Sequence, residues 1–242
     1  MASNGTKTAV VVSAHSADFV WRAGGAIALH AERGWEITVV CLSFGERGES
    51  AKLWRQPDMT MEKVKATRKQ EAIEAAGVLG AKTVFYDIGD YPMRVEDEVL
   101  YKLAKLYREV KPEFILTHTQ KDPYNFDHPL ASATAQEARI IAQAEGHDRS
   151  LKILGAPPVF LFEPHQPEQC EFQPDVLLDI TPVWEKKAAA FRTMAAQEHL
   201  WAYYERVALQ RGAQGARNSN RSTMKYGEAY QRIFPQVADT LQ

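Results

Sequence analysis

Cysteine is scarce in this chain of 242 residues, which contains only Cys41 and Cys170. Neither residue belongs to a CxxC pair, so the sequence carries no disulfide framework. A protein with so few cysteines is typical of a reducing compartment. We therefore expect a cytoplasmic location.

The chain also lacks an excess of charge and long apolar runs. Its formal net charge is −2, so no overall basic field attracts nucleic acid or a membrane surface. The first residues contain no apolar segment of the kind found in signal peptides, and no apolar run approaches the length of a membrane span. We expect no nucleic-acid partner and no membrane partner.

The composition is that of an ordinary globular protein, with 45% hydrophobic and 25% charged residues. A chain of this length can form one large α/β domain. We expect a single domain over residues 1–242. Residues 1–150 would form its core, and residues 151–242 would add strands, a helix and a loop that closes the site.

Strand and helix patterns alternate through the first two thirds of the chain. The expected strands span residues 8–13, 36–43, 83–87 and 114–117, and the expected helices span residues 24–33, 61–79, 95–110 and 130–144. This rhythm predicts an α/β fold with a doubly wound, mostly parallel sheet. Such sheets bind ligands beyond the carboxyl ends of their strands.

The pattern of the last third of the chain differs from that of the first two thirds, and it predicts an elaboration of the core. Residues 157–163 and 176–180 resemble strands, residues 184–201 resemble a helix, and residues 210–220 resemble a loop.

Possible metal ligands follow the predicted strands. His15 and Asp18 come after the first strand, and His128 comes after the fourth. Three protein ligands with one open position are typical of catalytic zinc, although iron and manganese accept similar sets. Each residue also has a structural interpretation, as a hydrogen-bonded histidine or a helix cap. Asp127 is a candidate partner for the neighbouring His128.

The residues from His15 to Gly25 resemble the AHPDDExxxxGG signature of the PIG-L/LmbE-like superfamily of zinc-dependent N-acetylglucosaminyl deacetylases. The resemblance continues through residues 45–49, 68–72 and 126–128, in the same order. It implies a Rossmann-like fold of the LmbE/PIG-L type. It also implies that His15, Asp18 and His128 bind Zn²⁺.

Several positions depart from the motifs of the superfamily. Ala17 stands where the deacetylases have the aspartate that acts as general base, Phe19 replaces a glutamate, and Asn125 replaces a histidine. A deacetylase needs a carboxylate to carry a proton from water to the leaving amine. Ala17 cannot do so, and the sequence therefore indicates a different reaction at a retained metal site.

One branch of the superfamily resembles the chain further. The runs HSADFVWRAGG, SFGERGESAKLW, DIGDYPM, DPYNFDHPLA and FEPHQPEQC resemble the 4-oxalomesaconate hydratases of bacterial gallate and protocatechuate degradation. This resemblance implies zinc-dependent hydration of 4-oxalomesaconate to 4-carboxy-4-hydroxy-2-oxoadipate. The partner would be a small tricarboxylate, and we expect a homo-oligomer.

A hydratase needs a base that activates water. Glu49 is the favoured candidate and Glu46 is the alternative, in a loop whose glycines suggest a specially shaped turn. A tricarboxylate substrate needs cations and hydrogen-bond donors, and the guanidinium of arginine can donate two parallel hydrogen bonds to one carboxylate. The candidate substrate-binding residues are Arg22, Arg47, Tyr124, Asn125, His165 and Arg211.

Two other functions stay open on the sequence. The first is a deacetylase or amidase in which Glu46 or Glu49 replaces the missing base. The second is a non-catalytic module that binds a carbohydrate or an acid.

Overall fold

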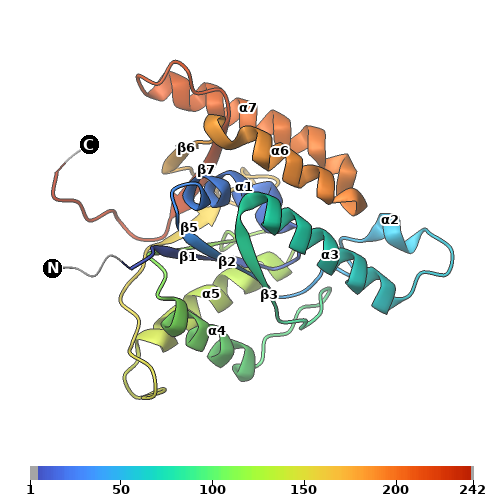
Figure 1. The fold of residues 1–242 in the computed structure, drawn as a ribbon, viewed down its shortest axis with the longest axis horizontal. Coiled ribbons are helices and arrows are strands. Elements are labelled where there is room, and N and C mark those ends of the chain that lie inside the picture. The colour runs from blue at the N-terminus through green and yellow to red at the C-terminus, as the bar shows by residue number, and fades with distance from the viewer. Residues whose placement is uncertain (1–4, 241–242) are drawn as a thin grey trace.

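A computed structural model describes residues 5–240 and contains one seven-stranded sheet (Figure 1). Its strands are β1 (Thr8–Ser13), β2 (Glu36–Cys41), β3 (Ala81–Phe85), β4 (Phe114–Thr117), β5 (Val159–Phe162), β6 (Val176–Asp179) and β7 (Gly227–Arg232). They lie in the order β3-β2-β1-β4-β5-β7-β6. The first five in that order are parallel, and β7 is antiparallel to both of its neighbours.

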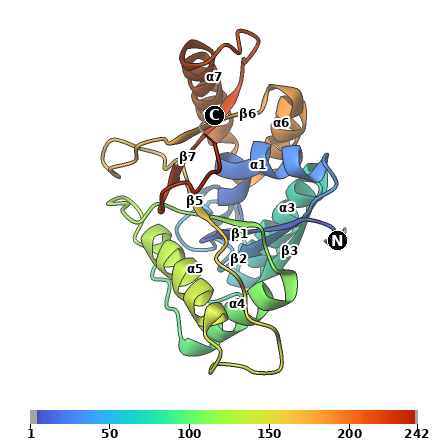
Figure 2. The ribbon, with the colours of Figure 1, turned by 90° about the vertical axis from the view of Figure 1, so that its left-hand side faces the viewer.

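Helices cover both faces of this sheet. They are α1 (Asp18–Ala31), α2 (Ala51–Trp54), α3 (Met61–Leu79), α4 (Asp97–Val110), α5 (Asp127–Gln143), α6 (Trp184–Thr193) and α7 (Trp201–Asn218), with the 3₁₀ helices η1 (Thr181–Val183) and η2 (Ala195–Leu200). Helices α1, α3 and α6 lie on one side and α4 and α5 on the other (Figures 1 and 2). The predicted doubly wound, mostly parallel sheet is therefore confirmed.

Strand β1 shows why the sequence adopts this layered fold. Val10 and Val12 pack into the core beneath α4 and α5, whereas Ala9 and Val11 pack into the core beneath α1 and α3. All four side chains are completely buried. A strand covered on both faces reads as a continuous apolar run rather than an alternating one.

The strand order places the functional crevice. The chain winds outward in one direction through β1, β2 and β3, and in the other through β4 and β5. The switch falls between β1 and β4, and loops leaving these two strands diverge to opposite faces of the sheet. A crevice opens at the carboxyl ends of strands at such a switch.

Helix α3 has the bounds that the sequence predicts, because both of its ends are encoded locally. The Thr60 hydroxyl accepts a hydrogen bond from the backbone N–H of Lys63 at the start. Gly80 ends the helix in the left-handed conformation, with φ of 82°.

The predicted start of the first helix is wrong. Helix α1 begins at Asp18 rather than at Gly24, so the two glycines lie inside it. A Cβ on Gly25 would lie only 2.5 Å from Cγ2 of Ile180 and 2.9 Å from Oε1 of Glu228. Close packing therefore explains Gly25.

The predicted C-terminal loop and helix are also wrong in part. Residues 210–218 belong to helix α7, and the helix expected over residues 184–201 is interrupted after Thr193. Glycine disfavours helices, but Cβ atoms on Gly212 and Gly215 would lie 2.0 Å from the Lys225 carbonyl oxygen and 2.4 Å from Sδ of Met224. Tertiary packing overrides local propensity here.

None of the helices within residues 5–240 combines the length and apolar character needed to cross a membrane.

Candidate active site

Four side chains of types that can bind a metal ion meet at the carboxyl ends of β1, β2 and β4. They are His15, Asp18, Glu49 and His128, and one ligand atom from each lies within 4.8 Å of the others. The fold thus brings the three predicted metal ligands together. It also adds Glu49, which the sequence suggested as a base.

Local hydrogen bonds and one glycine shape this cluster. Asp18, the first residue of α1, accepts a hydrogen bond from the backbone N–H of His15 at 2.8 Å. Gly45 has a φ of 69°, which favours glycine, and a Cβ there would lie 3.2 Å from the Cβ atoms of both His15 and Glu49. The glycine therefore allows the loop after β2 to bring Glu49 beside His15.

Two further carboxylates orient the histidine rings. Asp127 Oδ2 lies 3.2 Å from His15 Nε2, and Asp122 Oδ2 lies 2.8 Å from His128 Nδ1. The partner that we expected for His128 was Asp127, but neighbouring residues at the start of α5 point in different directions. Asp127 therefore holds His15, and Asp122 holds His128.

The ring nitrogens of this cluster that lack hydrogen-bond partners are suited to bind a metal ion. His15 Nδ1 and His128 Nε2 are buried and have no hydrogen-bond partner among residues 5–240. A carboxylate on the far nitrogen of each ring leaves the near nitrogen lone pair facing the cluster, as in proteins that bind metal through histidine. Two imidazole nitrogens with carboxylate oxygens suit zinc and other transition metals.

The charges of the cluster also fit a cation. Burial alone would lower the pKa of His15, but Glu49, Asp127 and Asp18 raise it above its ordinary value. Burial alone would raise the pKa of Asp18, but His118 and His128 lower it well below its ordinary value. Four carboxylates, those of Asp18, Glu49, Asp122 and Asp127, surround the rings of His15, His118 and His128, so this region attracts positive charge.

His118 is a member of this region that the sequence analysis left without a role. It follows β4 directly, and its Nε2 accepts a hydrogen bond from the backbone N–H of Ala14 at 3.0 Å. Its ring stacks on that of His128, with centroids 4.2 Å apart. Burial and the neighbouring His128 lower its pKa to about 3, so His118 is a neutral support for His128.

A cavity of about 210 Å³ adjoins the cluster. Its lining includes five residues that the sequence analysis proposed for catalysis or substrate binding, namely Arg22, Glu49, Tyr124, Asn125 and His165. The Asn125 side-chain amide donates to Glu49 Oε1 at 3.5 Å. His165 stacks on Tyr203, and its carbonyl oxygen accepts a hydrogen bond from the Tyr203 hydroxyl.

Three other candidates do not line this cavity. Glu46 is completely buried, and its Oε2 accepts a hydrogen bond from the backbone N–H of Phe44. Arg47 is half exposed and donates to the Asp90 carbonyl oxygen at 2.9 Å. Arg211 lies on α7 rather than on a loop, and its Nε donates to Glu163 Oε2 at 2.9 Å.

Several residues of the cavity lining were not proposed from the sequence, Tyr91 and Gln197 among them. Tyr91 has a φ of 43°, unusual for a residue with a side chain, and its backbone N–H donates to Asp127 at 3.1 Å. Its ring fills the space beside Gly48, where a Cβ would lie 2.2 Å from the ring. Gln197 accepts a hydrogen bond from Arg68 Nη2 at 2.7 Å. Tyr91 lies in the DIGDYPM run, and Gln197 lies in the helix expected over residues 184–201. Neither segment has a spacing of residues that indicates a cavity.

The hydrogen bond between Asp127 and His15 leads to a prediction about metal affinity. Changing Asp127 to Asn weakens the support of the ring, and loss of such a partner typically costs about 10- to 100-fold in metal affinity. Competition with a chromogenic chelator measures this change. The control is Asp97→Asn, an exposed residue in the first turn of α4, which should leave affinity unchanged. Equal affinity for both variants would contradict the support that we assign to Asp127.

Comparison with known proteins agrees with the family resemblance seen in the sequence. The family described as PIG-L, GlcNAc-PI de-N-acetylase, matches residues 10–139. A curated 4-oxalmesaconate hydratase from Pseudomonas putida is 64% identical over 238 residues, which cover 97% of this chain and 92% of that protein.

Solved structures agree with this match. The crystal structure of GalB, the 4-carboxy-2-hydroxymuconate hydratase from Pseudomonas putida, is 64% identical and superposes with a TM-score of 0.96, covering 98% of this chain and 100% of the other. The N,N'-diacetylchitobiose deacetylase from Pyrococcus horikoshii has a TM-score of 0.77 at 22% identity, covering 94% of this chain and 84% of the other. The deacetylase shares the fold.

Proposed function

The chain belongs to the PIG-L family, described as GlcNAc-PI de-N-acetylase, and we propose that within this family it is a zinc-dependent hydratase. It adds water to a carbon–carbon double bond of 4-oxalomesaconate and forms 4-carboxy-4-hydroxy-2-oxoadipate. The observation that carries this function is the 64% identity to a 4-oxalmesaconate hydratase along almost the whole of both chains.

The residues of the cluster have separate roles in this proposal. His15, Asp18 and His128 would hold the zinc ion, and Asp127 and Asp122 would orient the two rings. When bound, zinc acts as a Lewis acid that polarises a substrate oxygen or makes bound water more acidic.

Glu49 is the proposed general base. Its Oε1 lies 3.2 Å from His15 Nδ1 and its side chain lines the cavity, 15% exposed. It takes one proton from water while the hydroxyl adds to the carbon that carries the branching carboxylate. The neighbouring carbon gains a proton, so the elements of water are added across the double bond. Glu46 is turned away toward Phe44 and cannot reach the same position without rearrangement of its loop.

Residue 17 argues against the deacetylase alternative. Ala17 is completely buried and has no group that exchanges a proton. Amide hydrolysis needs a proton at the leaving nitrogen, whereas hydration releases no amine. The missing carboxylate therefore argues against a deacetylase, and its absence does not impair a hydratase.

The expected partner is a small tricarboxylate, and Arg22, Tyr124, Asn125 and His165 are the proposed contacts from the cavity wall. A cytoplasmic location and assembly into a homo-oligomer belong to the same proposal. Two free, buried cysteines are compatible with a reducing compartment.

An activity assay tests the function directly. Purified protein supplied with zinc is expected to consume the enone chromophore of 4-oxalomesaconate and to release no acetate from N-acetyl sugars. Acetate release without hydration would support the deacetylase instead. Binding of the acid without turnover of either substrate would support the non-catalytic module.

A further inference from the structure

Arg22 is a buried cation whose hydrogen-bonding capacity is largely unused. Its side chain is only 6% exposed, and neither Nε nor Nη1 has a hydrogen-bond partner among residues 5–240. The ion pair to Asp18 is long, at 3.8 Å between Nε and Oδ1. A guanidinium keeps its charge in proteins, and a buried charge is costly unless hydrogen bonds compensate it.

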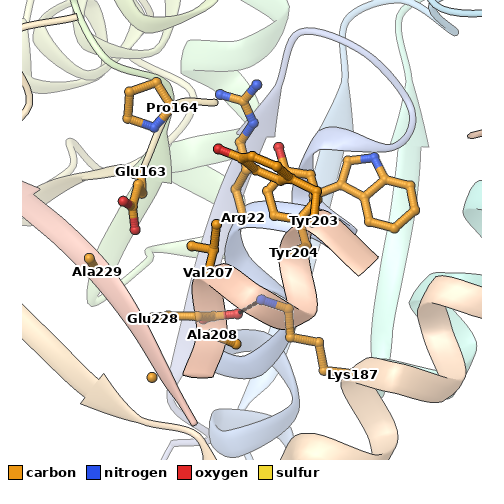
Figure 3. Close-up of a pocket in the computed structure, with 12 residues that line it drawn as sticks. Arg22, Glu163, Pro164, Lys187, Tyr203, Tyr204, Val207, Ala208, Glu228 and Ala229 are labelled. Carbon is orange, nitrogen blue, oxygen red and sulfur yellow. Dashed lines mark hydrogen bonds and ion pairs between the residues drawn. The ribbon is translucent and has the colours of Figure 1, made fainter. Parts of the chain in front are cut away.

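Other acidic side chains near Arg22 are already engaged. Arg22 also borders a second, smaller cavity that contains Glu163 and Glu228 (Figure 3). Glu163 is bound by Arg211, and Glu228 accepts a hydrogen bond from Lys187 at 2.6 Å. Figure 3 shows the Arg22 side chain extending away from the Lys187–Glu228 pair. The protein thus supplies separate cations for these two acids, so neither of them compensates the charge of Arg22.

The position of Arg22 directs it to the active site. It lies on α1 one turn after Asp18, and both residues line the 210 Å³ cavity together with Glu49 and His128. Asp18 and Glu49 belong to the metal cluster, and Asp122, which lines the same cavity, holds His128. A bound anion would supply the hydrogen-bond acceptors that Nε and Nη1 of Arg22 lack.

We propose that Arg22 binds one carboxylate of the substrate in this cavity and thereby selects carboxylate-bearing substrates over neutral sugars. The identity of that substrate as a tricarboxylate rests on the proposed hydratase function. Arginine and a carboxylate form two parallel hydrogen bonds, which hold the substrate in one orientation as well as attract it. An N-acetyl sugar has no anionic group to offer at this position.

Equilibrium binding separates this role from catalysis. Propane-1,2,3-tricarboxylate serves as an unreactive probe, measured by calorimetry against the zinc-loaded protein. Changing Arg22 to Met should weaken its binding about 10- to 100-fold, the range expected for charged hydrogen bonds. Arg22→Lys keeps the charge and should recover only part of the affinity. The control is Arg206→Met, which removes an equal charge from an exposed position on α7.

The substrate itself gives a second measurement. With 4-oxalomesaconate, Arg22→Met should raise KM more than it lowers kcat, and the zinc content should stay equal to that of the unchanged protein. The unfolding temperature of Arg22→Met without ligand should not fall, because the variant removes a buried charge that lacks hydrogen bonds. A role in folding alone would lower that temperature.

These measurements have distinct outcomes. Equal affinity of Arg22→Met and the unchanged protein for the probe would overturn the proposal, as would loss of affinity accompanied by loss of zinc or of folding. Arg22-dependent binding of the probe without hydration of 4-oxalomesaconate would overturn the hydratase function and leave the carboxylate site standing.

Discussion

Replacing Glu49 with glutamine is expected to lower kcat for hydration of 4-oxalomesaconate by about 10²- to 10⁴-fold, the usual contribution of a general base. Glutamine has almost the same shape as glutamate but cannot accept a proton from water. The Asn125 amide, which donates to Glu49 at 3.5 Å, can still donate to the glutamine oxygen. The cavity should therefore keep its shape and lose its base.

The zinc content of this variant decides between two roles for Glu49, because its carboxylate lies within the metal cluster. A base can be lost while zinc stays bound, whereas loss of a ligand lowers zinc content along with activity. Steady-state kinetics and metal analysis of the same preparation distinguish these results.

The matched variant is Glu46→Gln. Glu46 lies three residues earlier in the same loop, and its carboxylate accepts a hydrogen bond from Phe44 instead of facing the cavity. We expect a smaller loss of activity from this change. An inactive Glu46→Gln variant beside an active Glu49→Gln variant would transfer the base assignment to Glu46.

Replacing Glu228 with alanine is expected to lower the free energy of unfolding by about 3–5 kcal/mol, the range for breaking a buried ion pair from one side. Glu228 and Lys187 are each only 3% exposed and lie 2.6 Å apart. The carboxylate also accepts hydrogen bonds from the backbone N–H groups of Gly25 and Ala26, at 2.6 and 2.8 Å. The alanine variant would leave these donors and the Lys187 charge buried without their partner.

Chemical denaturation measures this change. The control is Glu36→Ala, because the ion pair of Glu36 with Lys82 lies at the surface, with side chains 57% and 74% exposed. Surface ion pairs contribute little, so this control should unfold almost as the unchanged protein does. A double change of Glu228 to Gln and Lys187 to Met should recover part of the lost stability, since it removes the unpaired charge. A loss no larger than that of the control would contradict the role assigned to the buried pair.

The buried pair has a consequence for the active site as well. Gly25 and Ala26 lie in the same helix as Asp18 and Arg22. The C-terminal part of the chain therefore holds the helix that supplies one predicted metal ligand and the proposed carboxylate contact. Gly25, the second glycine of the superfamily signature, gains a physical explanation, since a side chain there would collide with Ile180 and Glu228.

Features encoded by neighbouring residues were predictable from the sequence. Strand β1 is a short, wholly apolar run, and α3 has its capping threonine and terminal glycine at the correct spacing. The C-terminal helix α7 was not predictable in this way. Its glycines disfavour a helix locally, and only their close contacts with Met224 and Lys225 explain why the helix continues.

By itself, the sequence determined the kind of chemistry available. It contains His15, Asp18 and His128 after predicted strands, and Ala17 where a deacetylase has a carboxylate, and these are matters of residue identity and order. The tertiary structure alone decided the direction of each side chain. It pairs Asp127 with His15, pairs Asp122 with His128 and turns Glu49 toward the cavity. It also binds Arg211 to Glu163, while Nε and Nη1 of Arg22 have no hydrogen-bond partner in the described part of the chain. The physical reason is that these partners come from separate loops and helices, and only the packed sheet sets the distances between them.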